Sequence, residues 1–145
     1  SDKDFAQLQR FSNVEQYSPI LKKYIKESLP LVQLKQLIIR GDKGDGIPNI
    51  LSKDETFIDR IRQKPITEAK IIGWMNQEAK EFCNDEMLRN YKRNESLIDL
   101  RMIPTKIQQD ICDAYEQIKP KSKNQFMNYM ISKKLKNLIE VLDEF

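Results

Sequence analysis

Apolar residues recur at helical spacing from residue 30 onward. Leu34 and Ile38 lie four positions apart after Pro30, which places them on one face of a helix. Proline suits the first turn of a helix, and Gly41 suits the position just past its end. The pattern therefore predicts a helix from Pro30 to the residue before Gly41.

The middle of the chain repeats this helical pattern with interruptions. The spacing predicts a short helix over 54–63 that places Phe57, Ile58 and Ile61 on one face. Thr67 is expected to cap the next helix, because its hydroxyl can accept a bond from a free N–H of the first turn. A helical continuation from residue 79 is expected to break at Arg93-Asn94, before an extended connector over 97–104.

The last third predicts more helices. A helix over 105–119 would bury a stripe of five residues: Ile107, Ile111, Ala114, Tyr115 and Ile118. A basic linker over 119–123 is followed by helices expected over 124–133 and 135–142.

The first 29 residues have a different pattern. Phe5 and Leu8 suggest a short helix, with Ser1 or Asp2 as its cap. Short runs over 14–17 and 21–25, separated by Ser18-Pro19, predict a hairpin. The fold class is therefore mainly α, with a short β-hairpin near the N-terminus.

The composition limits which catalytic groups, metal ligands and partners the chain can have. The 145 residues suit one domain, and no apolar run approaches the roughly 20 residues of a membrane span, so no membrane partner is expected. The chain has no histidine, which removes the usual general base and zinc ligand. Cys83 and Cys112 lack metal-ligand spacing and indicate reduced thiols in a cytoplasmic protein. A net charge of +3 is only a weak indication of an anionic partner.

The most specific stretch is the loop at 40–50. It carries three glycines and two aspartates, Asp42 and Asp45. Glycines let the main chain approach a ligand closely, and carboxylates can hold a hard cation such as magnesium. An EF-hand is excluded, because glycine stands at 44 and lysine at 53 where oxygen ligands are needed. The alternative is a solvated Asp/Gly turn after a helix.

Basic residues near this loop suggest that it binds the phosphate backbone of a nucleic-acid duplex. Lys43, Gly44 and Gly46 would approach one phosphate group, and the helix start at Thr67 with Lys70 would take another. Supporting cations are Arg60, Arg62 and Lys64. A second cluster lies at Lys119, Lys121, Lys123, Lys133, Lys134 and Lys136. A solvated helix face is the alternative for such clusters.

The acids come in two pairs, Asp2 with Asp4 and Asp42 with Asp45. Two metal ions held by converging carboxylates can cleave phosphodiesters without histidine. Alternatively, Asp2 and Asp4 are caps at a helix start.

Both pairs fall in recognisable motifs. The segment Ser1-Asp2-Lys3-Asp4-Phe5-Ala6-Gln7-Leu8 resembles the acidic motif of the 5′ nuclease (flap endonuclease) superfamily. The segment Gly41-Asp42-Lys43-Gly44-Asp45-Gly46-Ile47-Pro48 resembles the next motif, which opens that family's helix-three-turn-helix DNA-binding element. The whole chain is similar to the C-terminal half of the T-even-type phage ribonuclease H group.

The resemblance implies a role for each matching residue. Asp2, Asp4, Asp42 and Asp45 would be metal ligands in a site for two Mg²⁺ ions, with no catalytic residue beyond them. By the resemblance, Lys43, Gly44 and Gly46 would lie at the duplex backbone and Lys70 would match the basic residue of the following helix. Together with the residues read from the pattern itself, the expected DNA-binding set is Lys43, Gly44, Gly46, Ile47, Arg60, Arg62, Thr67 and Lys70. The chain departs from many members at 51–65, which is longer and lacks their Gly-Ile-Gly turn.

The resemblance also implies what the chain lacks. The family's other acids, its catalytic lysine and arginine, its arch and most of its sheet would lie before Ser1. Residues 1–29 would be a remnant of the nuclease domain edge, and 30–145 the helical DNA-binding domain.

We therefore expect part of a nuclease that removes RNA primers in DNA replication, inactive alone. It would be monomeric, act in the cytoplasm of a phage-infected bacterium, and bind duplex, flapped or RNA-DNA hybrid nucleic acid. The phage single-stranded DNA-binding protein is a further expected partner. The alternatives are a non-catalytic docking module and a purely structural helical domain.

Overall fold

The protein is mainly helical, as the sequence predicts. The structure, a computed structural model, describes residues 3–119 and 122–142. The chain divides into two compact units, Ser1–Ile103 and Pro104–Phe145, which are described separately. The predicted division at residues 29 and 30 concerns a longer nuclease and stays a prediction.

The first unit begins with a short helix and a hairpin. The 3-10 helix η1 spans Asp4–Arg10, and strands β1 (Gln16–Ser18) and β2 (Lys23–Ile25) pair antiparallel with Tyr17 opposite Tyr24. The hairpin prediction is confirmed. The predicted caps Ser1 and Asp2 lie outside the described residues, and Lys3, at the cap position, makes no side-chain capping bond.

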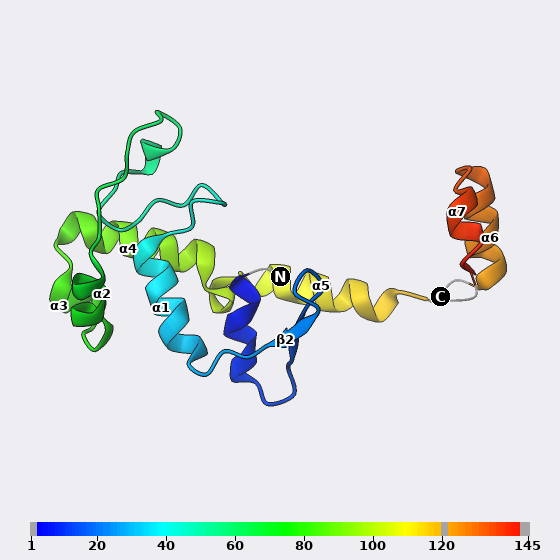
Figure 1. Ribbon diagram of the computed structural model, residues 1–145, viewed down its shortest axis with the longest axis horizontal. Helices are drawn as coiled ribbons and strands as arrows, with labels where there is room; N and C mark the ends of the chain where they lie inside the picture. Colours follow the sequence, from blue (N-terminus) through cyan, green and yellow to red (C-terminus); the bar gives the residue numbers. More distant parts are fainter. Residues whose placement is uncertain (1–2, 120–121, 143–145) are drawn as a thin grey trace. The chain divides into compact units, whose positions relative to one another are not determined.

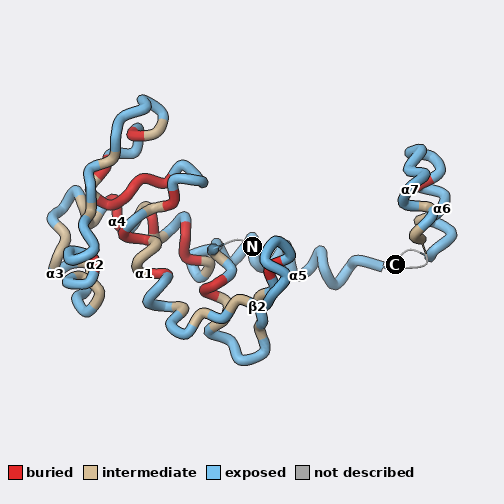
Figure 2. The backbone as a smooth tube through the Cα atoms, in the orientation of Figure 1, coloured by how far each residue is buried: buried red, intermediate tan, exposed pale blue. Residues whose placement is uncertain are grey.

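Helix α1 (Pro30–Arg40) organises the first unit, in which it packs against η1, α2 and α4 (Figure 1). Its proline stands in the first turn, and its buried face carries Leu34, Ile38 and Ile39. These side chains form one core with residues of the following loop and of the later helices: Ile47, Ile50, Ile71, Tyr91 and Ile98. Burial of these apolar side chains is the main stabilising contribution of the unit. Figure 2 shows buried residues in α1 and again at 47–50, with the exposed residues 43–46 between them.

Three further helices complete the core. Helix α2 (Glu68–Met75) has Thr67 at its cap, whose hydroxyl accepts the N–H of Lys70 as predicted. Helix α3 spans Ala79–Phe82 and α4 spans Asp85–Ile98. Trp74 stacks on Phe82 with ring centroids 5.0 Å apart, and Phe82 meets Tyr91 edge-on.

The prediction of a helix over 54–63 is wrong. Only the 3-10 helix η2 (Asp54–Thr56) forms. The chain then turns at Arg60, which adopts a left-handed φ of 56°, while the Ile61 N–H donates to the Thr56 carbonyl at 2.8 Å. These features end a helix in the manner of a Schellman motif, here without glycine. Ile58 and Ile61 are left 82% and 60% exposed instead of facing a core.

The prediction of a break at Arg93-Asn94 is also wrong. Helix α4 continues to Ile98, because the Asn94 side chain bonds carbonyls of other segments and does not compete for its own backbone. The predicted continuation from residue 79 is instead interrupted at Asn84, whose side chain caps α4. The expected extended connector is largely a 3-10 turn, η3 (Leu100–Met102), capped by Asp99.

The second unit contains the predicted helices, α5 (Thr105–Gln117), α6 (Lys123–Ser132) and α7 (Lys136–Ile139). The burial predicted for the α5 stripe is wrong: Ile107, Ile111 and Tyr115 are 49%, 60% and 77% exposed, and Ala114 and Ile118 are exposed too. Periodicity identifies an apolar face but not what covers it.

None of the helices that the structure describes is both long and apolar enough to cross a membrane.

Candidate nucleic-acid and metal site after helix α1

The candidate site starts at a glycine that no other residue can replace without strain. Gly41 follows α1 with a φ of 68°, and its N–H donates to the Leu37 carbonyl at 2.8 Å. A Cβ on Gly41 would stand 2.3 Å from the carbonyl oxygen of Ile47. The loop therefore folds back against the end of α1 only because residue 41 lacks a side chain.

Backbone and side-chain bonds close the loop. The Ile47 N–H donates to the Asp42 carbonyl at 2.8 Å, and the Gly44 N–H donates to Oδ1 of Asp42 at 2.8 Å. Gly46 takes a φ of 74° at the last turn. Residues 43–46 are exposed, whereas Asp42 and 47–50 are buried. The loop is thus a projecting tip on a buried base.

This geometry refines the predicted phosphate contacts. Lys43, Gly44 and Gly46 lie together on the exposed tip, but the N–H of Gly44 is already donated to Asp42. Ile47 is only 9% exposed and belongs to the core. Its side chain anchors the loop base, and the tip residues are the ones that a ligand could reach.

Helix α4 holds the base through side chains that sequence reasoning missed. The buried Asn94 donates to the carbonyls of Ile38 and Pro48 at 2.8 and 2.9 Å, and Arg93 also donates to Pro48 at 2.8 Å. Asn90, one turn earlier, donates to the carbonyls of Ile50 and Ser52. The signal available in the sequence was a pair of asparagines four apart on the apolar side of an amphipathic helix.

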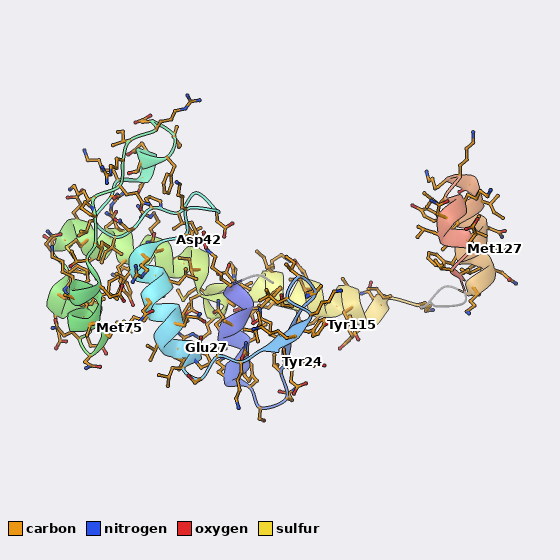
Figure 3. The ribbon with its side chains drawn as sticks, viewed as in Figure 1. Tyr24, Glu27, Asp42, Met75, Tyr115 and Met127 are labelled. Atoms are coloured by element: carbon orange, nitrogen blue, oxygen red, sulfur yellow. The ribbon has the colours of Figure 1, made fainter. Side chains whose placement is uncertain are left out.

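Asp42 is engaged by a lysine of the first motif. Lys3 Nζ lies 2.5 Å from Oδ2 of Asp42, whose side chain is only 8% exposed, whereas that of Lys3 is 68% exposed. The hydrogen bond from Lys3 is the main cause that holds the pKa of Asp42 below its usual range, against the opposing effect of burial. Figure 3 places Asp42 where α1 leads into the loop.

The remaining acids act on the same ammonium. Asp42 chiefly, and then Asp45 and Asp4 through their charges, raise the pKa of Lys3. Asp45 is exposed at the loop tip, and Asp4 is half-buried in the first turn of η1. Gln7 fixes η1, since its side chain donates to the Ile98 carbonyl and accepts the Leu100 N–H. The structure thus brings the two motifs together, while Asp2 lies outside the described residues.

These residues fit a divalent cation in part. Carboxylate oxygens are the ligands that magnesium prefers, and Asp42 already binds a cationic group, the Lys3 ammonium. However, within 3–119 and 122–142 no group of three or more histidine, cysteine, aspartate or glutamate residues could hold a metal ion. Asp4, Asp42 and Asp45 could contribute ligands to a metal site but do not form one by themselves.

The residues predicted for the second phosphate contact lie at the start of α2. Lys70 is exposed one turn into the helix behind Thr67. Glu68, also in the first turn, pairs with Arg40 at the end of α1. This ion pair links the two helix ends and offsets the negative charge of Glu68 beside the expected phosphate position.

The three predicted cations of the 51–65 segment share one concave surface. Arg60, Arg62 and Lys64 line an open hollow together with Lys43 of the loop tip. The structure therefore brings the loop and the 51–65 segment together on one basic face.

Comparison with known proteins identifies the family of the chain. A family model described as T4 RNase H, C terminal, matches residues 29–145. The chain is similar to the ribonuclease H of Enterobacteria phage T4, with 27% identity over 152 residues. That alignment covers 100% of this chain and 50% of the relative, so the chain spans about half the length of the curated relative it matches.

Proposed function

Because the chain belongs to the family of the C-terminal domain of T4 RNase H, we propose that it is the duplex-binding part of a phage-type 5′ nuclease. The observation that carries this proposal is the exposed tip at 43–46 on a base fixed by α4, with Lys70 at the start of the next helix. Two helices around a glycine-rich turn would form the helix-three-turn-helix element.

The tip suits a phosphate backbone better than it suits base edges. Glycines at 44 and 46 leave no side chain between the main chain and a ligand, and Lys43 supplies the charge. Such contacts position a duplex but read no sequence. Binding is therefore expected to be independent of sequence and strongly dependent on salt.

The test is equilibrium binding of a labelled blunt duplex, measured by fluorescence anisotropy over a range of salt concentrations. The double variant Lys43→Gln/Lys70→Gln should bind more weakly and lower the log-log salt slope by about 1.8, since each duplex phosphate contact contributes about 0.9. The control Lys80→Gln/Lys92→Gln removes the same charge from a different hollow beside Glu78 and Glu95. No measurable duplex affinity, or an equal loss in the control, would contradict the proposal.

We further propose that the acids serve catalysis only in a longer protein. Asp2, Asp4, Asp42 and Asp45 would contribute ligands to a site for two Mg²⁺ ions, which when bound would supply activation of water and stabilisation of the leaving oxygen in phosphodiester hydrolysis. The substrates would be flapped or nicked duplex and RNA-DNA hybrids, and the setting replication in an infected host. The 145-residue chain alone is expected to be inactive, because its described acids do not form a metal site.

A second candidate function is docking of a replication protein. The exposed apolar stripe of α5, which includes Ile111 and Tyr115, favours it. The proposed partner is the phage single-stranded DNA-binding protein, bound to a monomer of this chain. Calorimetry should show binding that Ile111→Ser weakens; unchanged affinity in this variant would rule out the stripe as the contact.

A further inference from the structure

The basic hollow beside the loop tip has an apolar lining as well as a charged one. Its cations are Lys43, Arg60, Arg62 and Lys64, and Phe57 and Ile61 are among its apolar lining residues. The hollow has about 520 Å³ of room and is open to solvent. No carboxylate is among its lining residues, although Asp54, Glu55 and Asp59 belong to the same segment. The charge of the hollow therefore suits an anion.

The segment that forms the hollow is fixed at both ends. Asp54 accepts bonds from the two terminal nitrogens of Arg89 at 3.0 Å and is also paired with Arg93, and both arginines lie on α4. At the other end, the Asn49 side chain donates to the Lys64 carbonyl at 2.8 Å, and the Lys64 N–H donates to Ser52 at 3.0 Å. Figure 1 shows the loop between these anchors standing away from α1 and α4. A loop held in this way presents its side chains with little loss of freedom on binding.

An unpaired strand matches this lining better than a duplex does. The outer surface of a duplex offers phosphates and sugars, which need the cations but not Phe57 or Ile61. An unpaired strand also exposes base faces, which stack on aromatic and apolar side chains. Gln63, another lining residue, accepts the Asn49 N–H through its Oε1, which leaves its amide group to donate to a base edge.

We infer that this hollow binds single-stranded DNA where a strand leaves the duplex held by the loop tip. The inference rests on the proposed duplex-binding function, because Lys43 belongs both to the tip and to the hollow. Arg62 and Lys64 neutralise phosphates of the unpaired strand, and Phe57 stacks on one of its bases. The longer 51–65 segment thereby adds a contact to an unpaired strand to the duplex contact made by the loop tip.

The test compares four labelled ligands: a blunt duplex, the same duplex with a ten-thymidine overhang at the 5′ end of one strand, the same duplex with that overhang at the 3′ end, and free oligothymidine of ten residues. Fluorescence anisotropy gives the affinities for the 145-residue chain and its variants. For the unaltered chain, one overhang should tighten binding about tenfold over the blunt duplex. In Arg62→Gln/Lys64→Gln this gain, taken relative to the blunt-duplex affinity of the same variant, should fall below about threefold, with a salt slope for oligothymidine about 1.4 lower.

Two controls separate charge from stacking and from misfolding. Lys80→Gln/Lys92→Gln, which removes the same charge elsewhere, should keep the overhang gain. Phe57→Leu keeps an apolar side chain but loses the aromatic face, and should weaken oligothymidine binding about fivefold with an unchanged circular dichroism spectrum.

If the blunt duplex binds but neither overhang adds affinity, the hollow is not a single-strand site and the duplex proposal stands. If no ligand binds, both fail. If oligothymidine alone binds and depends on Arg62 and Lys64, the duplex proposal fails, and with it the placement of the strand beside a bound duplex, while the hollow itself is a single-strand site.

Discussion

At the residue scale, the sequence predicted the glycine that ends α1, because glycine is favoured where the backbone must become left-handed. The φ of 68° at Gly41 confirms it. The sequence did not reveal that Lys3 would engage Asp42, since 39 residues separate them and only the packing of η1 on α1 brings them together. The sequence motifs grouped the four aspartates into two pairs. They could not show that the Lys3 ammonium would lie against Asp42.

Replacing three glycines by alanine should give three different results. Gly41→Ala should lower the free energy of unfolding by about 3 kcal/mol, because the left-handed backbone and the close Ile47 carbonyl both oppose a Cβ. Gly46→Ala, with the same backbone problem but open space, should lower it by about 1 kcal/mol. Gly73→Ala, inside α2, should raise it by about 1 kcal/mol. Urea denaturation measures all three, and equal effects at 41 and 46 would contradict the close packing described for the loop.

Lys3→Met should raise the pKa of Asp42, because burial still opposes ionisation once the hydrogen bond is lost. The lowered pKa in the folded state means that Asp42 stabilises the fold above its unfolded pKa of about 3.9, and that this contribution is lost as pH falls through the folded value. The variant should therefore lose less stability on acidification than the unaltered chain. Carboxyl NMR titration measures the pKa, with Lys106→Met as a control at an exposed pair on α5. An unchanged pKa in Lys3→Met would show that the pair contributes nothing to it.

At the element scale, helices with local start and stop signals were predictable. Pro30 and Gly41 bracket α1, and Thr67 begins α2, because each signal acts through the adjacent backbone. The errors arose where a distant contact decided the outcome. Asn94 reads as a helix breaker locally but is held by carbonyls of α1 and the loop, so α4 continues through it.

The α4 anchors provide a direct test of what positions the loop. Asn94→Ala should lower the free energy of unfolding by about 2 to 3 kcal/mol, since two buried carbonyls lose a donor and a cavity remains. Ser96→Ala, on the exposed side of the same helix, should change it by less than about 0.5 kcal/mol. Duplex affinity measured on folded protein should fall in the first variant only. Full duplex affinity in Asn94→Ala would show that the anchor does not position the tip.

At the scale of the whole molecule, the mainly helical class and the small hairpin followed from apolar periodicity. The exposure of the α5 stripe did not, because periodicity cannot identify a partner that the described chain does not supply. The two acidic motifs meet within the first unit, yet the described residues form no metal site. The same loop is thus proposed to hold a duplex in this chain and to contribute ligands to a catalytic site only in a longer protein.

The most direct test of these two proposed roles of the loop is magnesium-dependent cleavage of a labelled 5′-flap substrate. It compares the 145-residue chain with a longer form that carries, before Ser1, a segment equivalent to the N-terminal half of the phage relative. We expect the short chain to bind the substrate without cleaving it, and the longer form to cleave it and to lose that activity in Asp45→Ala. Robust cleavage by the short chain, or full activity of the longer form with Asp45→Ala, would contradict the account.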